Sequence, residues 1–172
     1  MIKAVLCSLI VAICSYTGFI YGERYKKRFN NLKELQRSLL QLENEILFAY
    51  TSLPTAVSNI AMKSKGCIKP LFLEISLSLS ENKFDSVYEA FTFSFEKYKE
   101  QLNFTDEDLS IIMDLSKSLG EVDILGHEKI FALASNNLKK SIDDSEDSVR
   151  KNLKMYRYLG ICSGLGIVIL LL

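Results

Sequence analysis

The sequence is poor in residues that break helices and in residues that perform most enzyme and metal chemistry. Its 172 residues include two prolines, eight glycines, one histidine and no tryptophan. So few turn-forming residues leave little room for loops, and the composition favours helix. Basic and acidic residues balance at 21 each, so a formal net charge of zero gives no general attraction for nucleic acid. The four cysteines form no CxxC pair, which argues against a disulfide framework.

Candidate catalytic and metal-binding groups are equally sparse. His127 is the single histidine, and no His/Cys/Asp cluster surrounds it at ligand spacing. The stretch GEVDILG has neither the spacing nor the Lys-Ser/Thr pair of a phosphate-binding loop. Thr51 or Ser52 as a hydrolase nucleophile would need a base and an oxyanion site, and the nearby sequence supplies neither. We therefore predict a non-enzymatic protein without a cofactor, a metal site or a nucleic-acid partner.

Both ends of the chain are apolar. No charged residue lies between Ala4 and Tyr21, and a helix of that length spans about 27 Å, close to the hydrocarbon thickness of a bilayer. A cleaved signal peptide is the alternative, but a basic cluster at 24–28 follows at once and no clean cleavage site precedes it. Residues 158–172 form the second apolar run, with Arg150, Lys151, Lys154 and Arg157 before it.

These patterns predict two transmembrane helices, at residues 1–22 and 158–172. Both basic clusters lie on the side of the middle segment, so the positive-inside rule places residues 23–157 in the cytoplasm, with the cell membrane's lipid bilayer on either flank. Gly18 and Gly22 are four residues apart, as are Gly160 and Gly164. Small residues at this spacing let membrane helices approach closely, although glycine is also simply common in such helices.

The middle segment has helical periodicity. Apolar residues recur every three or four positions at Leu32, Leu35, Leu39, Leu42, Ile46 and Ala49. Further amphipathic stretches follow, with starts expected at Pro54, Pro70, Asp85, Thr105 and Asp123. Strand-like alternation is lacking. We predict an all-α fold: a cytoplasmic bundle of about six helices, flanked by the N-terminal and C-terminal transmembrane helices, with its first and last helices continuing into them.

Three places are candidates for a partner interface or for structural corners. The stretch EILFAYTSLPTA holds the first, in which Thr51 or Ser52 is expected to cap the helix begun by Pro54, beside Glu45 and Tyr50. Gly120 and Asp123 form the second, between the fifth and sixth helices. The third is the acidic cluster of Asp143, Asp144, Glu146 and Asp147, which is a solvated helix face, negative charge held away from the membrane, or a surface for a basic partner.

Two blocks carry a resemblance to a known family. The first is LKELQRSLLQLENEILFAYTSLPTA, after the basic flank ERYKKR, and the second is SLGEVDILGHEKIFAL. With the two apolar ends, the chain resembles the stage III sporulation protein AB family of endospore-forming bacteria over nearly its whole length. It departs from the family's pattern at Gly126-His127, where Gly-Gln is expected, and at Ala90-Phe91, where Ala-Trp is expected. Both look like packing substitutions.

The resemblance implies a helical bundle similar to the cytoplasmic domains of type II secretion F and pilus platform proteins. It implies a place in the mother-cell membrane, within the channel apparatus that links mother cell and forespore. The implied partners are a cytoplasmic secretion-type ATPase and other membrane components of the sporulation channel. The alternative from the residues alone is a two-span scaffold or receptor whose bundle docks a regulatory protein.

Overall fold

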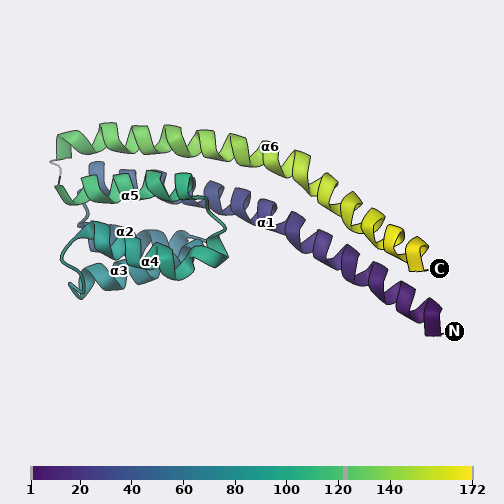
Figure 1. Cartoon of the computed structure of the whole chain (residues 1–172). Helices are drawn as coiled ribbons and strands as arrows, with labels where there is room; N and C mark the ends of the chain where they lie inside the picture. Colours follow the sequence, from purple (N-terminus) through teal and green to yellow (C-terminus); the bar gives the residue numbers. More distant parts are fainter. Residues whose placement is uncertain (1, 122–123, 172) are drawn as a thin grey trace. The chain divides into compact units, whose positions relative to one another are not determined.

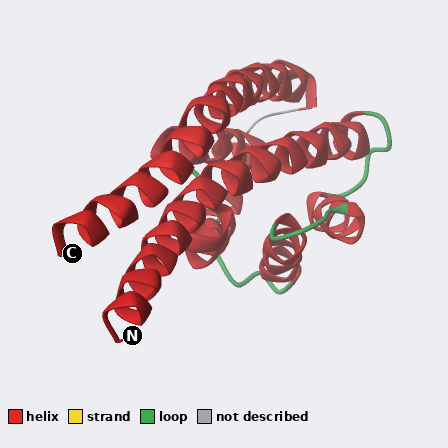
Figure 2. Cartoon of the chain, turned by 90° about the vertical axis from the view of Figure 1, so that its right-hand side faces the viewer, coloured by secondary structure: helices red, strands yellow, loops and turns green. Residues whose placement is uncertain are grey.

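The computed structural model describes residues 2–121 and 124–171, and within them the chain is helical throughout apart from short connections (Figures 1 and 2). The helices are α1 (Ile2–Leu47), α2 (Leu53–Lys63), α3 (Ile68–Ser80), α4 (Val87–Leu102), α5 (Asp106–Glu121) and α6 (Ile124–Leu171). The predicted all-α fold with six helices is confirmed, and the described residues contain no strand. None of the helices is both long and apolar enough, over its described residues, to cross a membrane.

The chain divides into two compact units, which we describe separately. One unit runs from Asn30 to Asp143 and contains the second part of α1, the whole of α2 to α5 and the first part of α6. The other contains the first part of α1 and the second part of α6. In the first unit consecutive helices α2 to α5 pack on their neighbours, and the short loops between them make those neighbours antiparallel.

The core of the Asn30–Asp143 unit is built from the seam that the sequence predicts on α1. Leu32, Leu35 and Leu42 are completely buried, and Leu39 and Ile46 nearly so. The prediction is wrong for Ala49, which is exposed beyond the end of the helix. The other helices contribute large buried side chains to this core, chiefly Phe72, Phe91, Phe95 and Phe131.

The ends of the helices are closed by side chains. At the start of α5, the Asp108 N–H donates to the Thr105 hydroxyl (3.3 Å) and the Thr105 N–H donates to the Asp108 carboxylate (2.9 Å). This reciprocal capping box satisfies two otherwise unpaired donors, and α5 begins directly after Thr105, where the sequence predicts a helix start. At α4 the capping residue is Ser86, which accepts from the Glu89 N–H, and not the predicted Asp85. Helix α3 begins at Ile68, two residues before the predicted Pro70, because proline is tolerated anywhere in a first turn.

A polar junction joins three helices where α1 enters this unit. The Asn31 amide donates to the carbonyl of Leu102 (2.9 Å), at the end of α4, and accepts the Cys67 thiol (3.2 Å), before α3. Further along α1, the buried hydroxyls of Ser38 and Ser64 share a hydrogen bond of 2.9 Å. These contacts fix the register of α1 against the loop between α2 and α3.

Candidate functional site

The corner between α1 and α2 is organised by Glu45. Its carboxylate accepts hydrogen bonds from Thr51 (3.1 Å) and Asn59 (3.2 Å), and Lys63 forms an ion pair with it at 3.5 Å. The hydrogen bond from Asn59, followed by that from Thr51, lowers the pKa of Glu45 because both stabilise the ionised form. Glu45 is thus the centre of a polar network that connects the end of α1 to the turn before α2 and to two residues of α2 itself, Asn59 and Lys63.

Tyr50 turns the chain at this corner with a left-handed backbone. Its φ is 51°, a region that residues other than glycine and asparagine seldom adopt. The turn lets the Thr51 N–H donate to the carbonyl of Glu45 (2.9 Å), which satisfies one of the unpaired carbonyls at the end of α1. The Tyr50 side chain itself is 75% exposed, and so is that of Phe48 at 74%.

The hydroxyls beside Pro54 do not cap α2 as expected. Ser52 occupies the capping position, but its side chain makes no bond to a backbone N–H and pairs with the Thr55 hydroxyl at 2.9 Å. Pro54 does lie in the first turn of α2. The Thr51 hydroxyl is directed to Glu45, a carboxylate whose lowered pKa makes it a weaker base. The arrangement therefore favours a structural corner over a nucleophile and base.

Gly120 lies inside the last turn of α5, which runs to Glu121, and not between the fifth and sixth helices as predicted. A Cβ built on it would meet the Val87 side chain at 3.7 Å, so α4 and α5 approach closely here. Asp123, the other residue predicted for this corner, lies outside the described residues. His127 follows on α6, is buried, and has no hydrogen-bond partner for either ring nitrogen within the described structure. No group of three or more potential metal ligands occurs among the residues described.

A pair of carboxylates repel each other between α1 and α6. Burial, and to a smaller extent the charge of Glu128, raise the pKa of Glu43. An opposite arrangement lies between α3 and α4, where Lys97 and Glu74 are 2.9 Å apart. The hydrogen bond to Glu74 raises the pKa of Lys97. An ion pair thus joins α3 and α4, whereas α1 and α6 bring two carboxylates of like charge together.

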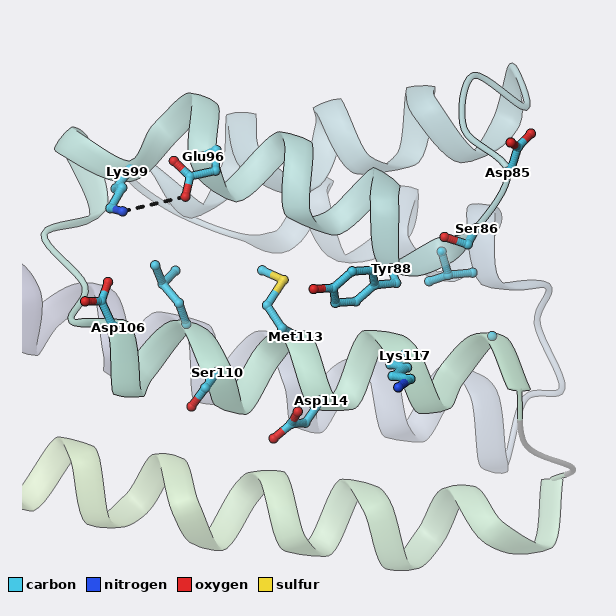
Figure 3. A pocket seen from close by; sticks show the side chains of 13 residues that line it. Asp85, Ser86, Tyr88, Glu96, Lys99, Asp106, Ser110, Met113, Asp114 and Lys117 are labelled. Atoms are coloured by element: carbon cyan, nitrogen blue, oxygen red, sulfur yellow. Dashed lines mark ion pairs between the residues drawn. The ribbon is translucent and has the colours of Figure 1, made fainter.

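A groove that the sequence did not indicate lies between α4 and α5 (Figure 3). Its volume is about 840 Å³. Tyr88 and Met113 lie between the two helices, and the Thr92 hydroxyl donates to the Met113 sulfur at 3.3 Å. Tyr88 is 42% exposed because the two helices leave this gap open. Tyr88 lies three residues before Phe91 and seven before Phe95, a spacing that places it on the same side of α4 as these buried residues, so the helical pattern contains no signal for its exposure.

Comparison with known proteins decides the family. Residues 3–172 match the family described as stage III sporulation protein AB. The chain belongs to this family. The stage III sporulation protein AB of Bacillus subtilis (strain 168) is 30% identical over 172 residues, and the match covers 100% of both chains. A solved structure of a stage III sporulation protein AB superposes with a TM-score of 0.67 at 27% identity, covering 72% of this chain and 97% of that one.

Membership of the stage III sporulation protein AB family confirms the resemblance drawn from the two sequence blocks. It shows a sporulation protein, and the solved relative supports the helical bundle independently. The name attached to these relatives describes a stage of spore formation and no enzymatic activity. The roles of individual residues remain predictions on this chain.

In this family member, the acidic cluster lies on α6 as predicted. Asp143, Asp144 and Asp147 are exposed, whereas Glu146 pairs with Arg150 at 2.7 Å, one turn along the helix. Such a surface pair contributes little to stability, so the cluster keeps most of its negative charge. Whether it is only solvated or also binds a partner stays open as a prediction.

The glycine pairs of the predicted membrane helices lie on α1 and α6. Gly22 is buried. The surroundings of Gly18, Gly160 and Gly164 fall outside what the structure describes. The packing of these helices through their glycines therefore remains a prediction.

Proposed function

We propose that this protein is a non-enzymatic, two-span membrane component of the apparatus that joins mother cell and forespore, and that its bundle serves as a platform on the cytoplasmic side. The observation that carries the proposal is the family match over residues 3–172, which makes the chain a sporulation protein along its whole length. The membrane part rests on the sequence. The uncharged run Ala4–Tyr21 and the apolar run 158–172 each carry a basic cluster on the side of the bundle.

The platform role is supported by the way α1 and α6 are built. Each is one uninterrupted helix that includes both a predicted span and a segment packed in the bundle. A change in the bundle therefore reaches the predicted span without crossing a loop. We propose that a cytoplasmic secretion-type ATPase acts on the bundle, and that the spans assemble with other membrane components of the channel.

The partner is tested by co-purification from sporulating cells. The full chain, tagged and produced at its native level, is expected to retain the ATPase and at least one other channel component after detergent extraction. A variant with Ile46→Asp, which disrupts the core, should lose both while still being inserted in the membrane. Retention of neither partner by the wild-type chain would refute the platform role and favour a scaffold for a different regulatory protein.

Topology needs a separate measurement. Cys67 is a poor reporter because it is half-buried and bonded to Asn31, so we choose Glu81→Cys, at an exposed position after α3, in a chain whose four native cysteines are replaced by serine. A membrane-impermeant maleimide should label it only after the cells are opened. Labelling of intact cells would overturn the orientation and the docking of a cytoplasmic ATPase with it.

A further inference from the structure

The groove between α4 and α5 has the length of a helix-binding site. Both helices have 16 residues, which corresponds to about 24 Å and accommodates roughly four turns of a partner helix. At one end of the groove Gly120 of α5 faces the Val87 side chain of α4, which an added Cβ would meet at 3.7 Å, an ordinary contact distance. Away from that contact the helices leave the volume of about 840 Å³ open to solvent.

The floor of the groove is apolar and incompletely buried. Tyr88, Leu109 and Met113 line it, and Figure 3 shows Tyr88 and Met113 between the two helices. Apolar surface remains accessible here on the exposed part of Tyr88 and on the half-buried Leu109 and Met113. Apolar residues of a partner would remove this surface from water. Methionine adapts its shape to a partner and tyrosine offers a rigid surface with a polar tip, so this floor suits an apolar helix seam.

The charge along the groove specifies the partner. Its lining includes four carboxylates and two lysines, and Glu96 and Lys99 pair with each other at 3.6 Å. Asp85, Asp106 and Asp114 form no ion pair in the described structure, and against them the groove has only Lys117. The carboxylates are distributed from the loop before α4 to the first and middle turns of α5. An anionic ligand is disfavoured by this excess, whereas a helix with lysine or arginine beside its apolar seam is favoured.

We propose that the α4–α5 groove binds a cationic amphipathic helix of another protein. The apolar seam of that helix would cover Tyr88, Leu109 and Met113, as in other helix-in-groove complexes, and its basic residues would lie beside Asp106 and Asp114. This inference concerns a surface and a kind of partner. It does not depend on the ATPase or on the platform role, so the proposed function and the proposed helix-binding groove can be refuted separately.

The first test uses two synthetic probe peptides and the full chain in nanodiscs of zwitterionic lipid. The peptides share one leucine and alanine seam, and their polar faces carry either lysine or glutamate. Fluorescence anisotropy, corrected with empty nanodiscs, should show binding of the lysine peptide at least tenfold tighter than that of the glutamate peptide. Equal affinities would overturn the proposal.

Matched variants assign the binding to the groove. Asp106→Asn combined with Asp114→Asn should weaken the lysine peptide about fivefold, because two favourable charge contacts of modest size are lost. Glu81→Gln combined with Glu100→Gln removes the same charge from exposed positions outside the groove and should leave the affinity unchanged. Circular dichroism checks that both variants keep the helix content of the wild type. Equal loss in the two variants would show a general charge effect and refute the site.

The partner's identity is tested by a photo-crosslinking residue, p-benzoylphenylalanine, in place of Leu109 in sporulating cells. Mass spectrometry of the product should identify a segment of a different protein, with an amphipathic helical pattern and a net positive charge. A product formed with a second copy of this chain or with an acidic segment would contradict the proposal. The absence of any crosslinked protein would also contradict the proposal, provided that the variant with p-benzoylphenylalanine at position 109 accumulates to the wild-type level.

Discussion

The left-handed backbone at Tyr50 predicts a reversed order of preference between alanine and glycine. In an ordinary helix position glycine is less stable than alanine by about 1 kcal/mol. At a φ of 51° the order changes, because a Cβ costs about 1–2 kcal/mol there, whereas the added freedom of glycine in the unfolded chain costs about 0.5–1 kcal/mol. We therefore expect Tyr50→Gly to be more stable than Tyr50→Ala by about 0.5–1 kcal/mol.

The contribution of the ring is separated by the same pair of variants. Tyrosine has about 200 Å² of surface, and the Tyr50 side chain keeps about a quarter of it from solvent, so removing the ring costs at most about 1 kcal/mol. Tyr50→Ala should therefore lose up to that amount relative to the wild type. Tyr50→Gly should recover most of the loss and lie close to the wild type, despite removing more atoms.

The assay is urea unfolding of the Asn30–Asp143 unit, followed by circular dichroism. The solved relative, whose chain corresponds to 72% of this one, supports the use of a shortened chain. The same two substitutions at the exposed Asn44, inside α1, provide the control and should favour alanine by about 0.5–1 kcal/mol. If glycine is the less stable residue at both positions, the left-handed turn at Tyr50 is not what closes the corner.

Three further predictions concern α1. Ile46→Asp places an unpaired charge in the core near a helix C-terminus, so the free energy of unfolding, measured by urea titration, should fall by about 4 kcal/mol. The control, Asn44→Asp at an exposed position of the same helix, should change it by less than about 0.5 kcal/mol. Glu45 has a lowered pKa, so the stability that its carboxylate contributes is present above the unfolded pKa of 4.5 and is lost as the pH falls through the folded pKa. Glu45→Gln should therefore be less stable than the wild type at pH 7. Thermal melts between pH 7 and pH 3 should show the difference in stability between the two proteins disappearing in acid. Burial, and to a smaller extent Glu128, raise the pKa of Glu43, so its ionisation costs stability as the pH rises from 4.5 through the folded pKa. Glu43→Gln should therefore be more stable than the wild type at pH 7 and equal to it in acid. A difference in stability that does not depend on pH would show that the ionisation of Glu43 is not its cause.

Much of the fold is predictable because it depends on periodicity along one helix at a time. The seam from Leu32 to Ile46 faces the core as expected, and the Thr105–Asp108 capping box starts α5. Local chemistry of this kind is visible in the sequence because its partners lie three or four residues apart.

What could not be predicted depends on distances between helices. The α4–α5 groove is lined by residues of two separate helices and of the loop before α4, and no single stretch of sequence records the spacing between them. The same limit applies to Glu45, whose partner Asn59 lies on the next helix and whose partner Thr51 lies beyond the turn. Asn59 could have been suspected only after α2 had been placed antiparallel to α1.

The Asn31 junction has a consequence for how the bundle responds to load. A pull along α1 from its apolar end reaches Asn31 before it reaches the buried Ser38–Ser64 bond, because Asn31 lies nearer that end of the helix. The Asn31 side chain donates to the last two carbonyls of α4 and accepts the Cys67 thiol, so this one residue holds three contacts at the place where α1 enters the unit. Under such a pull, Asn31 would transmit load from α1 directly to the end of α4 and to the residue that precedes α3.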